Sequence, residues 1–128
     1  MSLFNEVYAA ILDFCDITST DIVNETQGTD WVVQTTISGW RTRVIPSNSF
    51  FDILCGAIRN ILIGNVQKME YCKLHKDGLK KQLEPIWNKY SASEVKFNES
   101  DDIISNVLNI LKESYTFSKL SKVSVGVQ

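Results

Sequence analysis

The spacing between apolar residues changes along this chain of 128 residues, and the change limits the folds open to it. Between residues 2 and 16 the apolar positions recur every three or four residues, as on one face of an α-helix; they are Leu3, Val7, Ala10, Ile11 and Phe14. Between residues 31 and 45 the spacing becomes two, and β-branched or aromatic residues alternate in the pattern typical of strands. Helical spacing returns from residue 49. We therefore expect helices and strands in one domain.

The alternating segment predicts a β-hairpin. Residues 32–37 and 40–45 flank the pair Ser38 and Gly39, and a two-residue loop that contains glycine is typical of hairpins. In this register Ile37 lies opposite Trp40, and a shift of one residue would turn the tryptophan toward solvent. Residues 22–26 are expected to form either a third strand or a short helix.

After the hairpin we expect three to four helices. The first starts with Ser49 as its cap and ends at Gly64, and the second covers residues 66–90 with a break near Asp77 and Gly78. The last starts near Ser100. The tail beyond residue 118 alternates valines and is expected to be a short edge strand or a frayed end.

The prediction is thus an α+β fold in a single globular domain, residues 1–128. It consists of an amino-terminal helix, a β-hairpin or short antiparallel meander, and then the helices. A chain of this size, with 44% hydrophobic and 22% charged residues, buries enough surface to fold without disulfides or metal.

An all-α fold with a helix-turn-helix is the alternative. Residues 21–37 fit this motif with a turn near Gly28, and the string from Ile37 to Arg41 resembles the end of the reader helix of phage repressors. The reader segment, residues 29–37, contains no Lys or Arg to neutralise phosphates and is rich in β-branched residues, which lose side-chain freedom in helices. A DNA-binding regulator is therefore the second functional hypothesis, and we do not expect nucleic acid as the partner.

The three cysteines, Cys15, Cys55 and Cys72, are widely spaced and each has an apolar neighbour. An odd number cannot pair completely, so we expect free thiols packed in the core of a cytoplasmic protein. Cys72 and His75 have the spacing of half a zinc site, but no second Cys or His pair completes it. We expect no metal and no cofactor.

Motifs for catalysis are absent from the sequence. The six glycines never cluster into a phosphate-binding loop, and no nucleophile motif is present. No apolar stretch reaches the roughly 20 residues needed to cross a bilayer. We therefore expect neither an enzyme nor a membrane protein.

Charge is strongly segregated along the chain although the net charge is only −2. The first 40 residues hold six acidic residues and no basic one, whereas residues 41–92 hold nine basic and four acidic ones. Carboxylates without nearby basic residues create a field that attracts a positively charged partner.

The predicted binding surface extends from the first helix into the loop that follows it. It contains five carboxylates and one aromatic anchor: Asp13, Asp16, Asp21, Glu25, Asp30 and Trp31. We expect it to bind another, basic protein. The most concrete hypothesis is a small cytoplasmic inhibitor of the immunity or antitoxin type, which neutralises a basic toxin such as a nuclease.

Overall fold

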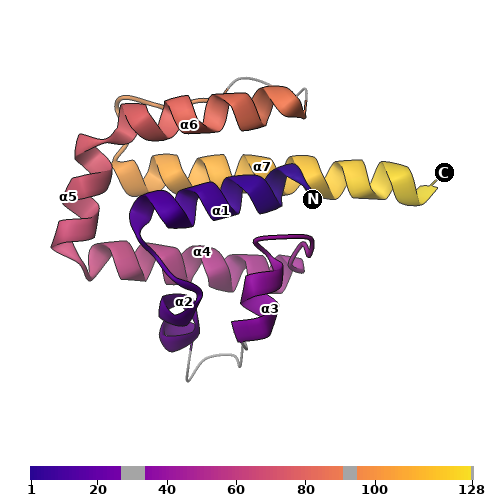
Figure 1. The fold of residues 1–128 in the computed structure, drawn as a ribbon, viewed down its shortest axis with the longest axis horizontal. Coiled ribbons are helices and arrows are strands. Elements are labelled where there is room, and N and C mark those ends of the chain that lie inside the picture. Colours follow the sequence, from indigo (N-terminus) through magenta and orange to yellow (C-terminus); the bar gives the residue numbers. More distant parts are fainter. Residues whose placement is uncertain (27–33, 91–94, 128) are drawn as a thin grey trace.

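Helix α1 (Leu3–Cys15) runs through the middle of the molecule, with other helices packed around it (Figure 1). The structure is a computed structural model that describes residues 1–26, 34–90 and 95–127. Six further helices are described: α2 (Ser19–Thr26), α3 (Gln34–Gly39), α4 (Asn48–Ile63), α5 (Val66–Leu74), α6 (Lys76–Lys89) and α7 (Ile103–Val127). α5 stands across one end of the bundle and links α4 to α6, while α2 packs against both α4 and α3 (Figure 1).

The sequence of α1 defines both of its ends. Ser2 caps the first turn, because its hydroxyl accepts a hydrogen bond from the Asn5 N–H at 3.2 Å while the Asn5 side chain accepts one from the Ser2 N–H at 3.0 Å. Asp16 ends the helix in the left-handed region, with φ of 56°. Nine of the 13 residues of α1 are buried. The predicted amino-terminal helix is confirmed.

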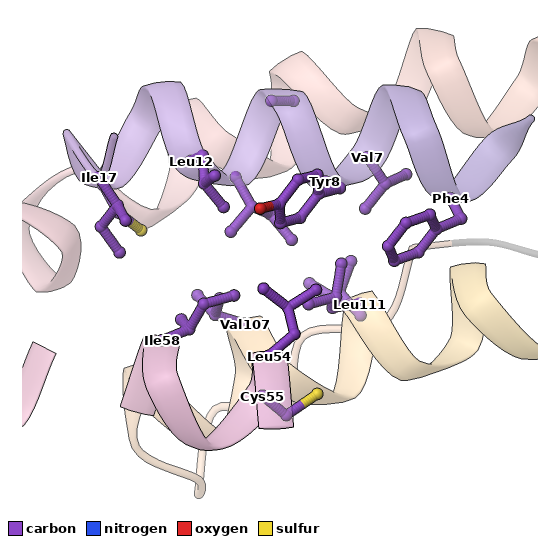
Figure 2. Close-up of a cluster of buried hydrophobic side chains, with 14 of the residues drawn as sticks. Phe4, Val7, Tyr8, Leu12, Ile17, Leu54, Cys55, Ile58, Val107 and Leu111 are labelled. Atoms are coloured by element: carbon purple, nitrogen blue, oxygen red, sulfur yellow. The ribbon is translucent and has the colours of Figure 1, made fainter. Parts of the chain in front are cut away.

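The core lies between α1, α4 and α7. Apolar side chains from the three helices point toward one another in Figure 2; they include Phe4, Val7, Tyr8 and Leu12 of α1, Leu54 and Ile58 of α4, and Val107 and Leu111 of α7. The Phe51 and Tyr115 rings stack with their centroids 3.9 Å apart and so join α4 to α7. Burial of this interleaved apolar surface is the main source of stability.

Helix α7 extends well past the rest of the bundle (Figure 1). Its first turn is capped by the Asp102 carboxylate, which accepts a hydrogen bond from the Ser105 N–H at 2.7 Å. The hydroxyl of Ser118, which is buried, accepts one from the Phe4 N–H at 2.9 Å. The helix then continues to Val127, so the predicted edge strand beyond residue 118 is wrong.

The predicted hairpin is also wrong, and with it the α+β class, because the described residues form seven helices and no strand. Residues 34–39 are helical, and the N–H groups of Thr42, Arg43 and Val44 all point to the carbonyl of Gly39. Ile37 and Trp40, three residues apart, are both buried. Residues 32 and 33 of the first expected strand, and residues 27–33 of the expected helix-turn-helix, lie outside the described residues.

A contact with α1 explains why this segment does not pair as strands. The side-chain NH₂ of Asn5, which is buried, donates to the carbonyls of Trp40 at 2.7 Å and Val44 at 2.9 Å. The ring of Trp40 packs edge-on against Tyr8 with a centroid distance of 6.5 Å. These contacts with α1 outweigh the strand propensity of the β-branched residues.

The remaining boundaries shift by small amounts. Residues 22–26 are helical, in α2. α4 has Ser47 rather than Ser49 as its cap, because the Ser47 hydroxyl accepts from the Phe50 N–H, and it ends at Gly64 as predicted. The region 66–90 is divided at His75 instead of Asp77. Among the described helices none is long and apolar enough to span a membrane alone, and the pair α4–α5, which together has the length and composition, is bent by 96°.

Candidate functional site: a cleft between α1 and α5

A cleft of about 410 Å³ opens where the end of α1 meets the start of α5. Its lining comes from two short stretches of chain: Asp13, Phe14, Cys15 and Asp16 on one side, and Asn65, Gln67, Lys68 and Tyr71 on the other. Two of the carboxylates predicted to bind a partner therefore lie in one concave site.

Asp16 lies at the rim of the cleft because the chain turns there. Its left-handed backbone ends α1, and its N–H is bonded back to the carbonyls of Leu12 and Asp13. Its side chain is 91% exposed. The Lys68 ammonium contacts both the Asp16 carbonyl and, at 3.3 Å, its carboxylate, and so connects α5 to the end of α1.

Asp13 also has a basic partner. Its carboxylate lies 2.6 Å from the Arg41 guanidinium and links α1 to the turn after α3. Because Arg41 and Lys68 both come from the basic part of the sequence, folding neutralises much of the charge segregation. The expectation that these carboxylates lack partners is wrong for Asp13 and Asp16.

Two of the other predicted residues, Asp21 and Glu25, lie away from the cleft lining. Asp21 caps α2, where its carboxylate accepts from the Thr18 N–H at 2.9 Å and its own N–H donates to the Thr18 hydroxyl at 3.1 Å. Glu25 is exposed in the last turn of the same helix. Asp30 and Trp31 lie outside the described residues.

The cleft also has an aromatic wall that sequence reasoning missed. The rings of Phe14 and Tyr71 lie 5.7 Å apart, and Tyr71 packs against His75 at 4.3 Å. Half of the Tyr71 surface is exposed. Phe14 and Tyr71 are 57 residues apart in the sequence, so no local pattern relates the two rings.

Helix α5 presents further apolar side chains to solvent. Val66 is 73% exposed and Leu74 is 78% exposed, and Cys72 is the one buried residue of the helix. Val66 and Leu74 are separated by two helical turns and so lie on the same side. Isolated apolar residues are common on surfaces, but Val66 lies between Asn65 and Gln67, which line the cleft, and Leu74 is one helical turn beyond Tyr71.

The predicted packing of the cysteines is confirmed, because Cys15, Cys55 and Cys72 are free and buried. Cys15 and Cys72 are close together, with their sulfurs 3.4 Å apart beside the cleft. His75 packs on Tyr71, and within the described residues no three Cys, His, Asp or Glu side chains are grouped to hold a metal ion.

Comparison of the chain with protein-family models, with curated proteins and with solved structures gives no match. The geometry and chemistry of the cleft are therefore the basis for a function.

Proposed function

We propose that this protein is a non-catalytic binding domain whose α1–α5 cleft receives a positively charged segment of another protein. One observation carries the proposal: two exposed carboxylates, Asp13 and Asp16, line the same open cleft as the rings of Phe14 and Tyr71. Both the carboxylates and the aromatic rings attract a lysine or arginine side chain.

The two walls act on different parts of such a side chain. Carboxylates form charge-assisted hydrogen bonds with an ammonium or guanidinium group. An aromatic face attracts the same cation and also packs against the methylene groups of its stem. Tyr71 combines a half-exposed ring with a position in the cleft, which is typical of an interface anchor.

The two ion pairs of the cleft limit how strongly its carboxylates attract a basic partner. Arg41 and Lys68 already compensate Asp13 and Asp16, so the attraction of a basic partner depends also on Asp21 and Glu25 of α2. We expect charge to set mainly the rate of association. The exposed Val66 and Leu74 next to the cleft would supply apolar contact area, which sets the rate of dissociation.

In its concrete form the proposal is a small cytoplasmic inhibitor of the immunity or antitoxin type that covers a basic site on a toxin such as a nuclease. The lack of catalytic motifs in the sequence supports binding without chemistry. Such an inhibitor needs neither metal nor cofactor, since its effect is to block the surface of its partner.

The test compares variants of the cleft with matched variants elsewhere. Asp16→Asn removes one charge and keeps a residue that tolerates the left-handed backbone, and Glu84→Gln on α6 is its control. Tyr71→Ala removes the aromatic anchor, and Leu120→Ala, at an exposed site on α7, is its control. A binding protein captured from the host at low salt is purified, and its association and dissociation rates are measured with each variant by surface plasmon resonance.

We expect Asp16→Asn to slow association about two-fold at low salt and Tyr71→Ala to speed dissociation about ten-fold or more, with both controls unchanged. Equal rates for all four variants and the parent would refute binding at the cleft. A gel-shift assay with duplex DNA gives the other outcome: tight binding that weakens steeply with salt would favour a DNA-binding regulator instead.

A further inference from the structure

Two thiols far apart in sequence meet where α1 packs on α5. Cys15 is the last residue of α1 and is 1% exposed, and Cys72 is fully buried in α5. Their sulfur atoms are 3.4 Å apart. Two cysteines packed only as small apolar residues need not place their sulfurs against each other, so this arrangement has chemical consequences.

We propose that Cys15 and Cys72 are an oxidation site, at which a small peroxide converts the two thiols into a reversible disulfide bond that links α1 to α5. The inference rests on the position of the two sulfurs and on the cleft beside them. It does not depend on the proposed binding function.

The geometry requires only a small movement. A disulfide bond is about 2.05 Å long, so the sulfurs must approach by a little over 1 Å. Cys15 is the last residue of its helix, and rotation of the two cysteine side chains can supply this approach. A thiophilic metal ion fits less well, because no third ligand joins the pair among the described residues.

Access to the pair comes from the cleft. Cys15 is among the residues that line it although it is only 1% exposed, so the pair lies directly beneath the cleft, and a small local opening is enough to admit a molecule the size of hydrogen peroxide. Lys68 lines the same cleft and brings a positive charge near both thiols. A nearby ammonium favours the thiolate, which is the reactive form of cysteine.

The two thiols share one negative charge when the first proton is lost. The hydrogen bond with Cys15 lowers the pKa of Cys72, burial opposes this, and Lys68 adds to the lowering. The same hydrogen bond, together with burial, raises the pKa of Cys15. The negative charge of the pair therefore lies mainly on the Cys72 sulfur, and the remaining proton is held by Cys15, 3.4 Å away.

The reaction consumes one peroxide for each pair. The Cys72 thiolate attacks one oxygen of hydrogen peroxide, the O–O bond breaks, and the departing hydroxide takes up a proton to become water, which leaves a sulfenic acid. The Cys15 sulfur then attacks the Cys72 sulfur, the S–O bond breaks, and a second water departs with the Cys15 proton. Two thiols are oxidised by two electrons, and the peroxide is reduced to two waters.

The third cysteine serves as an internal control. Cys55 is also buried, on α4, but it is not hydrogen-bonded to either of the other sulfurs in the described structure. Burial raises the pKa of Cys55 to about 11, with Lys112 and Asp52 acting in opposite directions. We therefore expect Cys55 to react slowly with peroxide.

The experiment treats the folded, reduced protein with hydrogen peroxide and follows it by intact mass spectrometry and peptide mapping. We expect a loss of about 2 Da and a linked pair of peptides containing Cys15 and Cys72, both reversed by dithiothreitol. The thermal midpoint should rise by roughly 10 °C on oxidation, because the bond closes a long loop in the unfolded chain. Cys55→Ala should give the same product.

Cys15→Ala and Cys72→Ala should each give no intramolecular disulfide. Because mapping of the parent protein locates the bond directly, the result stands even if one of these variants folds poorly. A disulfide that involves Cys55, a product linked between two chains, or oxidation of single thiols by whole oxygen atoms without a Cys15–Cys72 bond would overturn the inference. None of these outcomes bears on the binding experiment, which uses reduced protein.

Discussion

Helices α1 and α5 meet at the candidate site, yet they relate to solvent in opposite ways. α1 buries nine of its 13 residues and packs against α5, α6 and α7, whereas α5 buries only Cys72 of its nine. Ten of the 13 residues of α1 are apolar and none is basic, whereas α5 has two lysines, a glutamate and a glutamine among its nine. The contrast therefore arises both from the residue types of each helix and from where it lies in the bundle.

This contrast explains why a site can form between them. A helix buried on several sides holds its side chains in fixed positions, and its end at Asp16 is fixed with it. A helix that crosses the end of the bundle leaves polar and apolar groups free to meet another molecule. The α1–α5 cleft has one rigid wall from the first and one accessible wall from the second.

The largest expected effect comes from the same substitution in the two helices. Leu12 of α1 is fully buried and Leu74 of α5 is 78% exposed. Leu12→Ala should lower the free energy of unfolding by about 3 kcal/mol, because it removes buried methyl groups and leaves a cavity, while Leu74→Ala should change it by less than about 0.5 kcal/mol. Urea unfolding measures both. Similar losses would show that α5 is buried against something in solution.

A pair of asparagines gives an intermediate effect. Asn5 of α1 bridges the carbonyls of Trp40 and Val44, whereas Asn65 only caps α5 by accepting from the Lys68 N–H at 3.1 Å. Asn5→Ala should lower the free energy of unfolding by about 2 kcal/mol, because it leaves the two carbonyls without their donor. Asn65→Ala should lower it by about 1 kcal/mol, because it removes only a cap. Urea unfolding measures both.

Asn5→Asp sharpens this comparison. The aspartate keeps an oxygen for the cap of α1 but has no NH₂ to donate to the two carbonyls. It should be at least as destabilising as the alanine variant at neutral pH. A stable aspartate variant would show that capping, and not the bridge to residues 40–44, is the role of Asn5.

The smallest expected effect on stability comes from the carboxylates of the two helices, and it depends on pH. Burial raises the pKa of Glu6, but the Tyr90 hydroxyl and the Lys89 ammonium outweigh it, so the pKa lies below the ordinary 4.5. A lowered pKa stabilises the folded state above pH 4.5, and this stabilisation disappears as the pH falls through the folded pKa.

Glu6→Gln should therefore lower the free energy of unfolding by up to about 1 kcal/mol at pH 7 and leave it nearly unchanged at strongly acid pH. The loss is small because Lys89 is 62% exposed and water screens the ion pair. Glu70→Gln on α5, whose partner Lys73 lies 3.4 Å away in solvent, should have no measurable effect at either pH. Thermal unfolding at several pH values checks both. An equal loss for the two variants would mean that the position of the carboxylate in the bundle does not matter.

Sequence patterns predicted those elements whose own residues carry both the cap and the buried face. α1 was predicted within one residue at each end, because its apolar residues recur at helical spacing, and the structure adds the cap that Ser2 and Asn5 form. The carboxyl end of α4 was also predicted, since Gly64 directly follows the apolar stretch. The buried state of the three cysteines followed from their apolar neighbours.

The structure of residues 34–45 was decided by a partner distant in sequence. Alternation and β-branching favour strands there, but Asn5 and Tyr8 of α1 hold this segment in a helix and a turn. Local propensities amount to fractions of a kcal/mol per residue, so burial of Trp40 and satisfaction of two carbonyls outweigh them. The sequence contains each of these residues without showing that they touch.

By itself, then, the sequence determined the free and buried cysteines, the helix at the amino terminus and the acidic character of the first 40 residues. Only the tertiary structure decided that Asp13 and Asp16 find Arg41 and Lys68, that Tyr71 lies beside them, and that Cys15 meets Cys72. The physical reason is that periodicity and capping act over a few residues, whereas ion pairs, ring contacts and thiol pairs depend on distances in space that packing of the whole chain sets.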